Sequence, residues 1–206
     1  MPTALIADVQ SSRDLDNWPD VFRAIKRTLD QANRRFKDDL VVKFHPTVGD
    51  EFQGVLARPE VALDAYTFLK ASLPVRLYFG LGVGEVEKSN PKETGLRGSA
   101  FYRARAALEV CKRDNGLLRM KFPDNETGKY QIVNTILILI ETLEGSWSQR
   151  QHEVINYYRT NSGMTHEQIA NHFAVDRSTV THLFRDTRLK VIVEAETTLK
   201  NVVSED

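Results

Sequence analysis

The order of strand-like and helix-like segments in the first 86 residues is the feature that most limits the folds open to this chain. Short apolar runs alternate with segments whose apolar residues recur at helical spacing, in the order β-α-β-β-α-β. This order is typical of the split βαβ arrangement of ferredoxin-like folds. The expected strands are 3–9, 40–47, 51–56 and 75–86, and the expected helices are 17–36 and 59–71.

The pattern changes near residue 145. Before it, we expect a helix at 99–112, two more short strands at 117–122 and 129–133, and a buried helix at 134–143. After it, every segment has helical character. The sequence therefore predicts an α+β chain with a palm-like ferredoxin-like domain at 1–133, a connecting helix at 134–145 and an all-α domain at 146–206.

Glycines occupy every second position of one expected strand, at Gly80, Gly82 and Gly84. Because side chains alternate between the two faces of a strand, this spacing leaves one face without side chains. It indicates the close approach of another backbone or of a ligand.

Composition limits the protein classes. The chain has 206 residues, with 28 Lys plus Arg against 28 Asp plus Glu, so its formal net charge is zero. A neutral chain argues against a broad basic surface that holds nucleic acid non-specifically. One cysteine, no signal-peptide pattern and no long apolar run lead us to expect a cytoplasmic protein with no membrane partner.

Two acids lie where a palm-type site would need them, Asp8 at the end of the first strand and Asp50 in the predicted hairpin turn, with Glu51 as a third candidate. Mg²⁺ prefers one or two carboxylates together with water and substrate phosphates. Converging acids would therefore hold Mg²⁺, or Mn²⁺, with a nucleoside triphosphate. The small polar stretch after Asp8 could bind phosphate through backbone N–H groups, or its serines could simply cap a turn. That stretch is Val9, Gln10, Ser11 and Ser12.

Three segments carry a family resemblance: ALIADVQSSR, VGDEFQ and FGLGVGE. Together they resemble the SatD family, and they are similar to the palm shared by class III adenylyl cyclases and GGDEF diguanylate cyclases. The resemblance implies metal binding by Asp8 and Asp50, with Glu51 a weaker candidate, and phosphate binding by the loop after Asp8. The helical segment AFYRAR resembles the ALYxAK helix of diguanylate cyclases, which implies phosphate contact by Arg105. Val48 replaces the first glycine of GGDEF, and the late-helix asparagine and arginine of class III cyclases have no clear equivalents.

The C-terminal part contains the pattern T-x-x-Q-I-A-x-x-x-x-V-x-x-S-T-V, which begins at Thr165. It resembles the helix-turn-helix of sigma factors and response regulators, and the alternative is a helix pair used for protein contact. In a helix-turn-helix the second helix enters the major groove of DNA, and the base contacts fall near its N-terminus. The expected DNA-binding residues are the outward ones of this helix: Arg177, Ser178, Thr179, Thr181, His182 and Arg185.

These features favour a DNA-binding regulator, expected to be a homodimer, whose palm-like domain binds a Mg²⁺–nucleotide. The alternative is a nucleotidyl cyclase or related nucleotidyltransferase that uses the helix-turn-helix for targeting or interaction. A degenerate palm that only scaffolds a dimer is a third possibility, and the retained acids argue against it.

Overall fold

The computed structural model describes residues 1–47, 49–87, 97–161 and 163–205. Within these residues, the first part contains five strands and four α-helices, and four more α-helices follow it. The strands are β1 (Thr3–Val9), β2 (Leu40–Pro46), β3 (Glu51–Leu56), β4 (Leu77–Val83) and β5 (Leu118–Lys121). The helices are α1 (Trp18–Arg35), α2 (Pro59–Ser72), α3 (Ser99–Arg113), α4 (Thr127–Gly145), α5 (Gln149–Thr160), α6 (His166–Phe173), α7 (Arg177–Asp186) and α8 (Leu189–Ser204). Short 3₁₀ turns lie at Ser12–Asp14 and Asp124–Glu126.

The strands form one mixed sheet in the order β2-β3-β1-β4-β5. Strand β1 is central and pairs antiparallel with both β3 and β4, whereas β5 pairs parallel to β4. The first four strands thus have the arrangement expected for a β-α-β-β-α-β chain, and the predicted ferredoxin-like α+β fold is confirmed. Strand β5 extends the sheet by a crossover through α3.

The two faces of the sheet pack against different helices. Leu5, Ala7 and Val9 of β1 face the core formed with α1 and α2, whereas Ala4 and Ile6 face the smaller core beneath α3. Asp8 alternates with Ala7 and Val9, so it belongs to the α3 face at the end of the strand. The core on the α1–α2 face continues into the C-terminal helices through Ile155, Ile192 and Leu199, among others.

The predicted close approach at the glycines is a contact between backbones. A Cβ atom on Gly80 would lie 2.2 Å from the carbonyl oxygen of Ala104, and one on Gly82 would lie 2.1 Å from the carbonyl oxygen of Ala100. The missing side chains therefore let helix α3 lie directly on β4. This contact fixes the position of α3, which carries two residues of the candidate site.

The predicted strand at 129–133 is wrong, because these residues form the first turns of α4. Val133, Leu137 and Ile140 are buried at helical spacing, which continues the helix expected at 134–143. The Asn134 amide also accepts a hydrogen bond from Met120 N at 3.0 Å and donates to Met120 O at 2.8 Å, so it ties the helix to β5. The predicted boundary between residues 133 and 134 therefore falls inside a helix.

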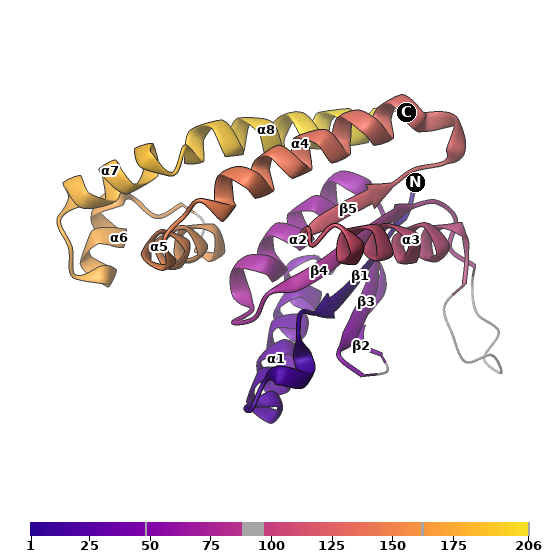
Figure 1. Cartoon of the computed structure of the whole chain (residues 1–206), viewed down its shortest axis with the longest axis horizontal. Coiled ribbons are helices and arrows are strands. Elements are labelled where there is room, and N and C mark those ends of the chain that lie inside the picture. The colour runs from indigo at the N-terminus through magenta and orange to yellow at the C-terminus, as the bar shows by residue number, and fades with distance from the viewer. Residues whose placement is uncertain (48, 88–96, 162, 206) are drawn as a thin grey trace.

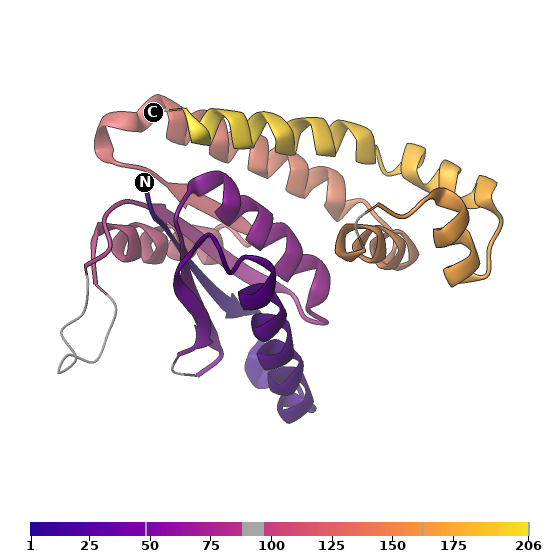
Figure 2. The ribbon, with the colours of Figure 1, turned by 180° about the vertical axis from the view of Figure 1, so that it is seen from behind.

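The C-terminal helices form an extended arm along one side of the sheet domain. Helices α4 and α8 run antiparallel side by side, and α6 and α7 lie at the far end of this pair (Figures 1 and 2). Helix α2 contacts both α5 and α8. Among the described residues, none of the helices combines the length and apolar composition that crossing a membrane would require.

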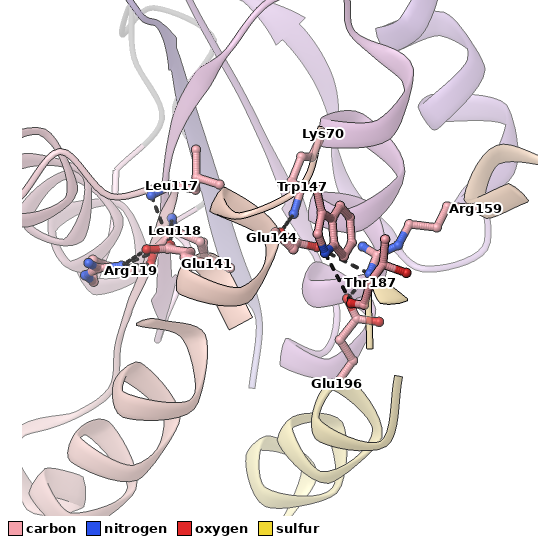
Figure 3. Close-up of polar contacts among 10 residues, drawn as sticks. All are labelled: Lys70, Leu117, Leu118, Arg119, Glu141, Glu144, Trp147, Arg159, Thr187 and Glu196. Atoms are coloured by element: carbon pink, nitrogen blue, oxygen red, sulfur yellow. Dashed lines mark hydrogen bonds and ion pairs between the residues drawn. The ribbon is translucent and has the colours of Figure 1, made fainter. Parts of the chain in front are cut away.

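A buried polar cluster joins four helices where the sheet domain meets this arm. Glu144 of α4 forms ion pairs with Lys70 of α2 and with Arg159 of α5, the latter at 3.4 Å, and Arg159 also pairs with Glu196 of α8 at 2.9 Å (Figure 3). Glu144 is 2% exposed. Close by, Trp147 Nε1 donates a hydrogen bond of 3.2 Å to the carbonyl oxygen of Thr187. The junction is therefore held by charges as well as by apolar packing.

Candidate functional site

The two acids predicted from the sequence lie on neighbouring parts of the sheet. Asp8 is at the carboxyl end of β1, and Asp50 is in the turn that leads from β2 into β3. Strands β1 and β3 are adjacent and in register, with Asp8 opposite Glu51. The turn therefore lies beside the end of β1, which brings Asp50 next to Asp8.

The carboxyl groups of Asp8 and Asp50 lie close enough for each to shift the pKa of the other. Burial raises the pKa of Asp8 above its ordinary value, and the neighbouring Asp50 carboxylate adds to the rise, while Lys112 opposes it. Burial would also raise the pKa of Asp50, but hydrogen bonds from Ser12 and Asp8 outweigh it and hold this pKa below its ordinary value. The pair is thus asymmetric, with Asp50 the more readily ionised member.

Lys112 is the site residue that sequence reasoning missed. Its ammonium group forms an ion pair with Asp8 Oδ2. Lys112 follows Arg105 by seven residues on α3, so both side chains lie on the same face of that helix. This spacing is the sequence signal that could have linked Lys112 to the predicted phosphate-binding Arg105.

Glu51 is held by Arg105 and not by the aspartates. The two side chains form a bidentate pair, with Arg105 Nη1 2.5 Å from Oε1 and Nη2 2.8 Å from Oε2. The hydrogen bond to Glu51 raises the pKa of Arg105 further above its ordinary value. Glu51 as a metal ligand and Arg105 as a phosphate contact both stay predictions, and each would require this pair to open.

The stretch predicted to bind phosphate is only partly a loop. Val9 belongs to β1 with its side chain in the core, and the Gln10 N–H donates a 3.0 Å hydrogen bond to Arg76 O. Its amide is therefore already bonded. Ser11, at φ 50°, and Ser12 form the turn itself, and the Ser12 side chain bonds to Asp50. Of the predicted stretch, the backbone of these two serines lies in the turn, and phosphate binding by the stretch stays a prediction. Val48, the position that departs from GGDEF, lies outside the described residues.

The C-terminal pattern folds as a pair of helices joined by a tight turn. Thr165 and Gln168 form the expected capping box at the start of α6, and Ala174 takes a left-handed conformation at φ 51° between α6 and α7. Ile169, Ala170 and Val180 pack with Val154 of α5 into a small core of their own. Helices α5, α6 and α7 thus share one core, and their role as a helix-turn-helix stays a prediction.

All six predicted DNA-binding residues are exposed on α7: Arg177, Ser178, Thr179, Thr181, His182 and Arg185. Two of them have local partners. The Thr181 hydroxyl donates to Arg177 O at 3.1 Å and lies 3.0 Å from His166 Nδ1, and Arg185 Nε lies 3.1 Å from Asp186 Oδ1. The surface is accessible, and its contact with DNA stays a prediction.

Comparison with known proteins assigns the family. The profile of the SatD family matches residues 3–203, which is nearly the whole chain. The chain belongs to the SatD family. No curated protein matches its sequence significantly.

Two solved structures resemble part of this SatD-family chain. A bacterial light-regulated adenylyl cyclase is 13% identical, with a TM-score of 0.41, and the match covers 58% of this chain and 74% of the cyclase chain. The catalytic core of a rhodopsin-guanylyl cyclase with converted specificity, in complex with ATPalphaS, is 19% identical, with a TM-score of 0.34. This second match covers 53% of the SatD-family chain and 71% of the other.

The donor set of the SatD-family chain at the end of β1 suits a divalent cation that is shared with phosphate. Two carboxylates and the Ser12 hydroxyl lie together, and the Lys112 ammonium pairs with Asp8. Within the described residues, no group of three or more His, Cys, Asp or Glu side chains could hold a metal ion. A metal at the two carboxylates would need water and phosphate oxygens to complete its shell, as Mg²⁺ and Mn²⁺ do, and the binding of such a metal stays a prediction.

Proposed function

We propose that this SatD-family protein is a DNA-binding regulator whose palm-like domain binds a Mg²⁺– or Mn²⁺–nucleoside triphosphate. The observation that supports this most directly is the contact between Asp8 and Asp50, with Lys112 beside them, at one end of the sheet. Acids that come together from separate strands and carry a nearby cation are suited to a metal and to phosphates at once.

In this proposal each residue has a separate task. Asp8 and Asp50 hold the metal, and the backbone of Ser11 and Ser12 donates to phosphate oxygens. Arg105 leaves Glu51 and offers its guanidinium as a bidentate phosphate donor. The metal itself would neutralise charge on the phosphates when it is bound. The buried Nε2 of Gln10, two residues after Asp8, has no hydrogen-bond partner among the described residues and is a further donor for the ligand.

We expect the Asp50→Asn variant to bind nucleoside triphosphate at least about tenfold more weakly than the parent in the presence of Mn²⁺, because it loses one of two metal-binding carboxylates. Binding is measured by calorimetry with each of the four triphosphates. The matched control is Asp30→Asn, which makes the same change on the exposed side of α1. Equal affinities of the parent and Asp50→Asn would contradict the proposed site.

The same experiment separates a regulator from an enzyme. A nucleotidyl cyclase would release pyrophosphate and a cyclic product from labelled triphosphate, and Asp50→Asn would abolish both. Binding without turnover favours the regulator. The missing late-helix asparagine and arginine weigh against turnover, which is why we place binding first.

The exposed face of α7 supports the DNA part of the proposal. We expect the Arg177→Ala, Arg185→Ala double variant to bind duplex DNA about tenfold or more weakly at low salt, because two cationic contacts with the DNA are removed. The measurement is fluorescence anisotropy with a mixed-sequence duplex, and Arg27→Ala, which removes an exposed cation of α1, is the control. An unchanged affinity would leave α6 and α7 as a protein-contact pair.

Regulation requires that the two sites be coupled. If nucleotide controls α7, adding Mg²⁺ and the bound triphosphate must change the DNA affinity of the parent, and DNA must change the nucleotide affinity by the same factor. The Asp50→Asn variant must lose this response. A homodimer, which we also propose, is tested by sedimentation with and without nucleotide.

A further inference from the structure

Lys112 occupies a carboxylate that an incoming metal would need. Its ammonium pairs with Asp8 Oδ2, and the Asp50 carboxyl lies beside Asp8. The Lys112 side chain is 31% exposed and that of Asp8 12%, so their charges are only partly screened by water. A divalent cation bound to the two carboxylates would lie within a few ångströms of this ammonium and would be repelled by it.

The backbone that carries Lys112 cannot move aside easily, whereas its side chain can. Helix α3 rests on Gly80 and Gly82 of β4 without intervening side chains, so its distance from the sheet is fixed. The lysine head is a compact charge on a flexible four-carbon stem. It can therefore leave Asp8 without disturbing the helix.

Arg105, on the same helix, is paired with a neighbouring acid in the same way. It neutralises Glu51, as Lys112 neutralises Asp8. In the protein without ligand, two cations from α3 thus compensate two of the three acids at this end of the sheet. If metal alone bound, both cations would lose their acidic partners. If phosphates arrived with the metal, the phosphate oxygens would be new partners for them.

We propose that Lys112 occupies the place of the metal in the free protein and thereby makes the site selective for a metal–triphosphate complex over the metal alone. The inference rests on the proposed nucleotide function and adds to it a residue and a rule of selectivity. Free metal must displace Lys112 with no compensation for the ammonium. A metal–triphosphate complex offers the displaced ammonium a phosphate oxygen, so the exchange of partners is balanced.

The test is Mn²⁺ binding by the full chain, followed by the electron paramagnetic resonance signal of free Mn²⁺. We expect Lys112→Met to bind Mn²⁺ alone about tenfold more tightly than the parent, and to bind triphosphate about tenfold more weakly at saturating Mn²⁺. The control is Arg113→Met, which removes the neighbouring cation, a side chain that is 71% exposed and paired with Asp114. This control is expected to match the parent in both measurements.

Lys112→Gln is the second variant. A glutamine keeps a hydrogen-bond donor near Asp8, so this variant keeps the test informative if the methionine variant does not fold. Circular dichroism and thermal unfolding establish that each variant is folded before titration. The expected opposite shifts, tighter for metal and weaker for triphosphate, would not arise from a merely structural role.

The outcomes distinguish this inference from the proposed function. If parent and Lys112 variants bind Mn²⁺ alone equally, and all bind Mn²⁺–triphosphate, the inference is overturned and the nucleotide site stands. If the Lys112 variants bind Mn²⁺ while the parent binds neither metal nor nucleotide, Lys112 occupies the metal position as proposed, but the selectivity for a metal–triphosphate complex is overturned together with the proposed function. If no protein binds Mn²⁺ under any condition, both are overturned.

Discussion

Replacement of Glu144 by alanine is expected to lower the free energy of unfolding by about 3–5 kcal/mol, because it takes this carboxylate from the buried Arg159 and the partly buried Lys70. Lys70 loses its ion-pair partner, and Arg159, 8% exposed, retains only Glu196. Charges taken out of water are costly unless they are paired, so the loss exceeds that of an ordinary hydrogen bond. Urea unfolding followed by tryptophan fluorescence measures the change, since Trp147 lies at the same junction.

The matched control is Glu194→Ala on α8. Its carboxylate lies 3.9 Å from Lys190, and both side chains are largely exposed, so we expect less than about 0.5 kcal/mol. A double variant, Lys70→Met with Glu144→Leu, should recover part of the lost stability because it removes one charge of each sign. A Glu144→Ala variant as stable as Glu194→Ala would contradict a structural role for the cluster.

Substitution of Gly82 by alanine is expected to cost about 3 kcal/mol, at the upper end of the usual range for overpacking. The added Cβ would meet the Ala100 carbonyl oxygen at 2.1 Å and the Ala104 nitrogen at 2.2 Å. Both are backbone atoms, so no side-chain rotation relieves the contact and helix α3 must move. Because α3 carries Arg105 and Lys112, we also expect weaker nucleotide binding. Chemical denaturation and calorimetry measure the two effects.

Gly128→Ala is the control for this substitution. Gly128 lies in the first turn of α4, and a Cβ there would have no neighbour within 4 Å. Alanine favours a helix over glycine, so this variant is expected to be unchanged or more stable by up to about 1 kcal/mol. If Gly82→Ala and Gly128→Ala behave alike, the direct contact of α3 with β4 is not what positions the helix.

Local patterns predicted most of the elements, and with them part of the site. The alternation in β1 and the helical spacing of α1 and α2 depend on neighbours a few residues away, which a sequence displays directly. The capping box at Thr165 is equally local. The meeting of Asp8 and Asp50 was also predictable, because the order β-α-β-β-α-β allows few topologies and places those strand ends together.

The failures concern contacts between elements. Residues 129–133 are as compatible with a short strand as with a helix, and only their packing against β5 through Asn134 decides for the helix. The same holds for Glu51. Its position in the strand does not predict the ion pair with Arg105, which lies 54 residues away in the sequence.

The sequence by itself determined the order of the elements in the first 86 residues, the ferredoxin-like sheet, the glycine-lined face of β4 and the family resemblance. Only the tertiary structure decided which cations neutralise which acids: Lys112 with Asp8, Arg105 with Glu51, and Lys70 with Arg159 around Glu144. The physical reason is the range of the interactions. Periodicity and capping arise within one or two turns of chain, whereas an ion pair depends on how the flexible side chains of distant elements meet after these elements have packed.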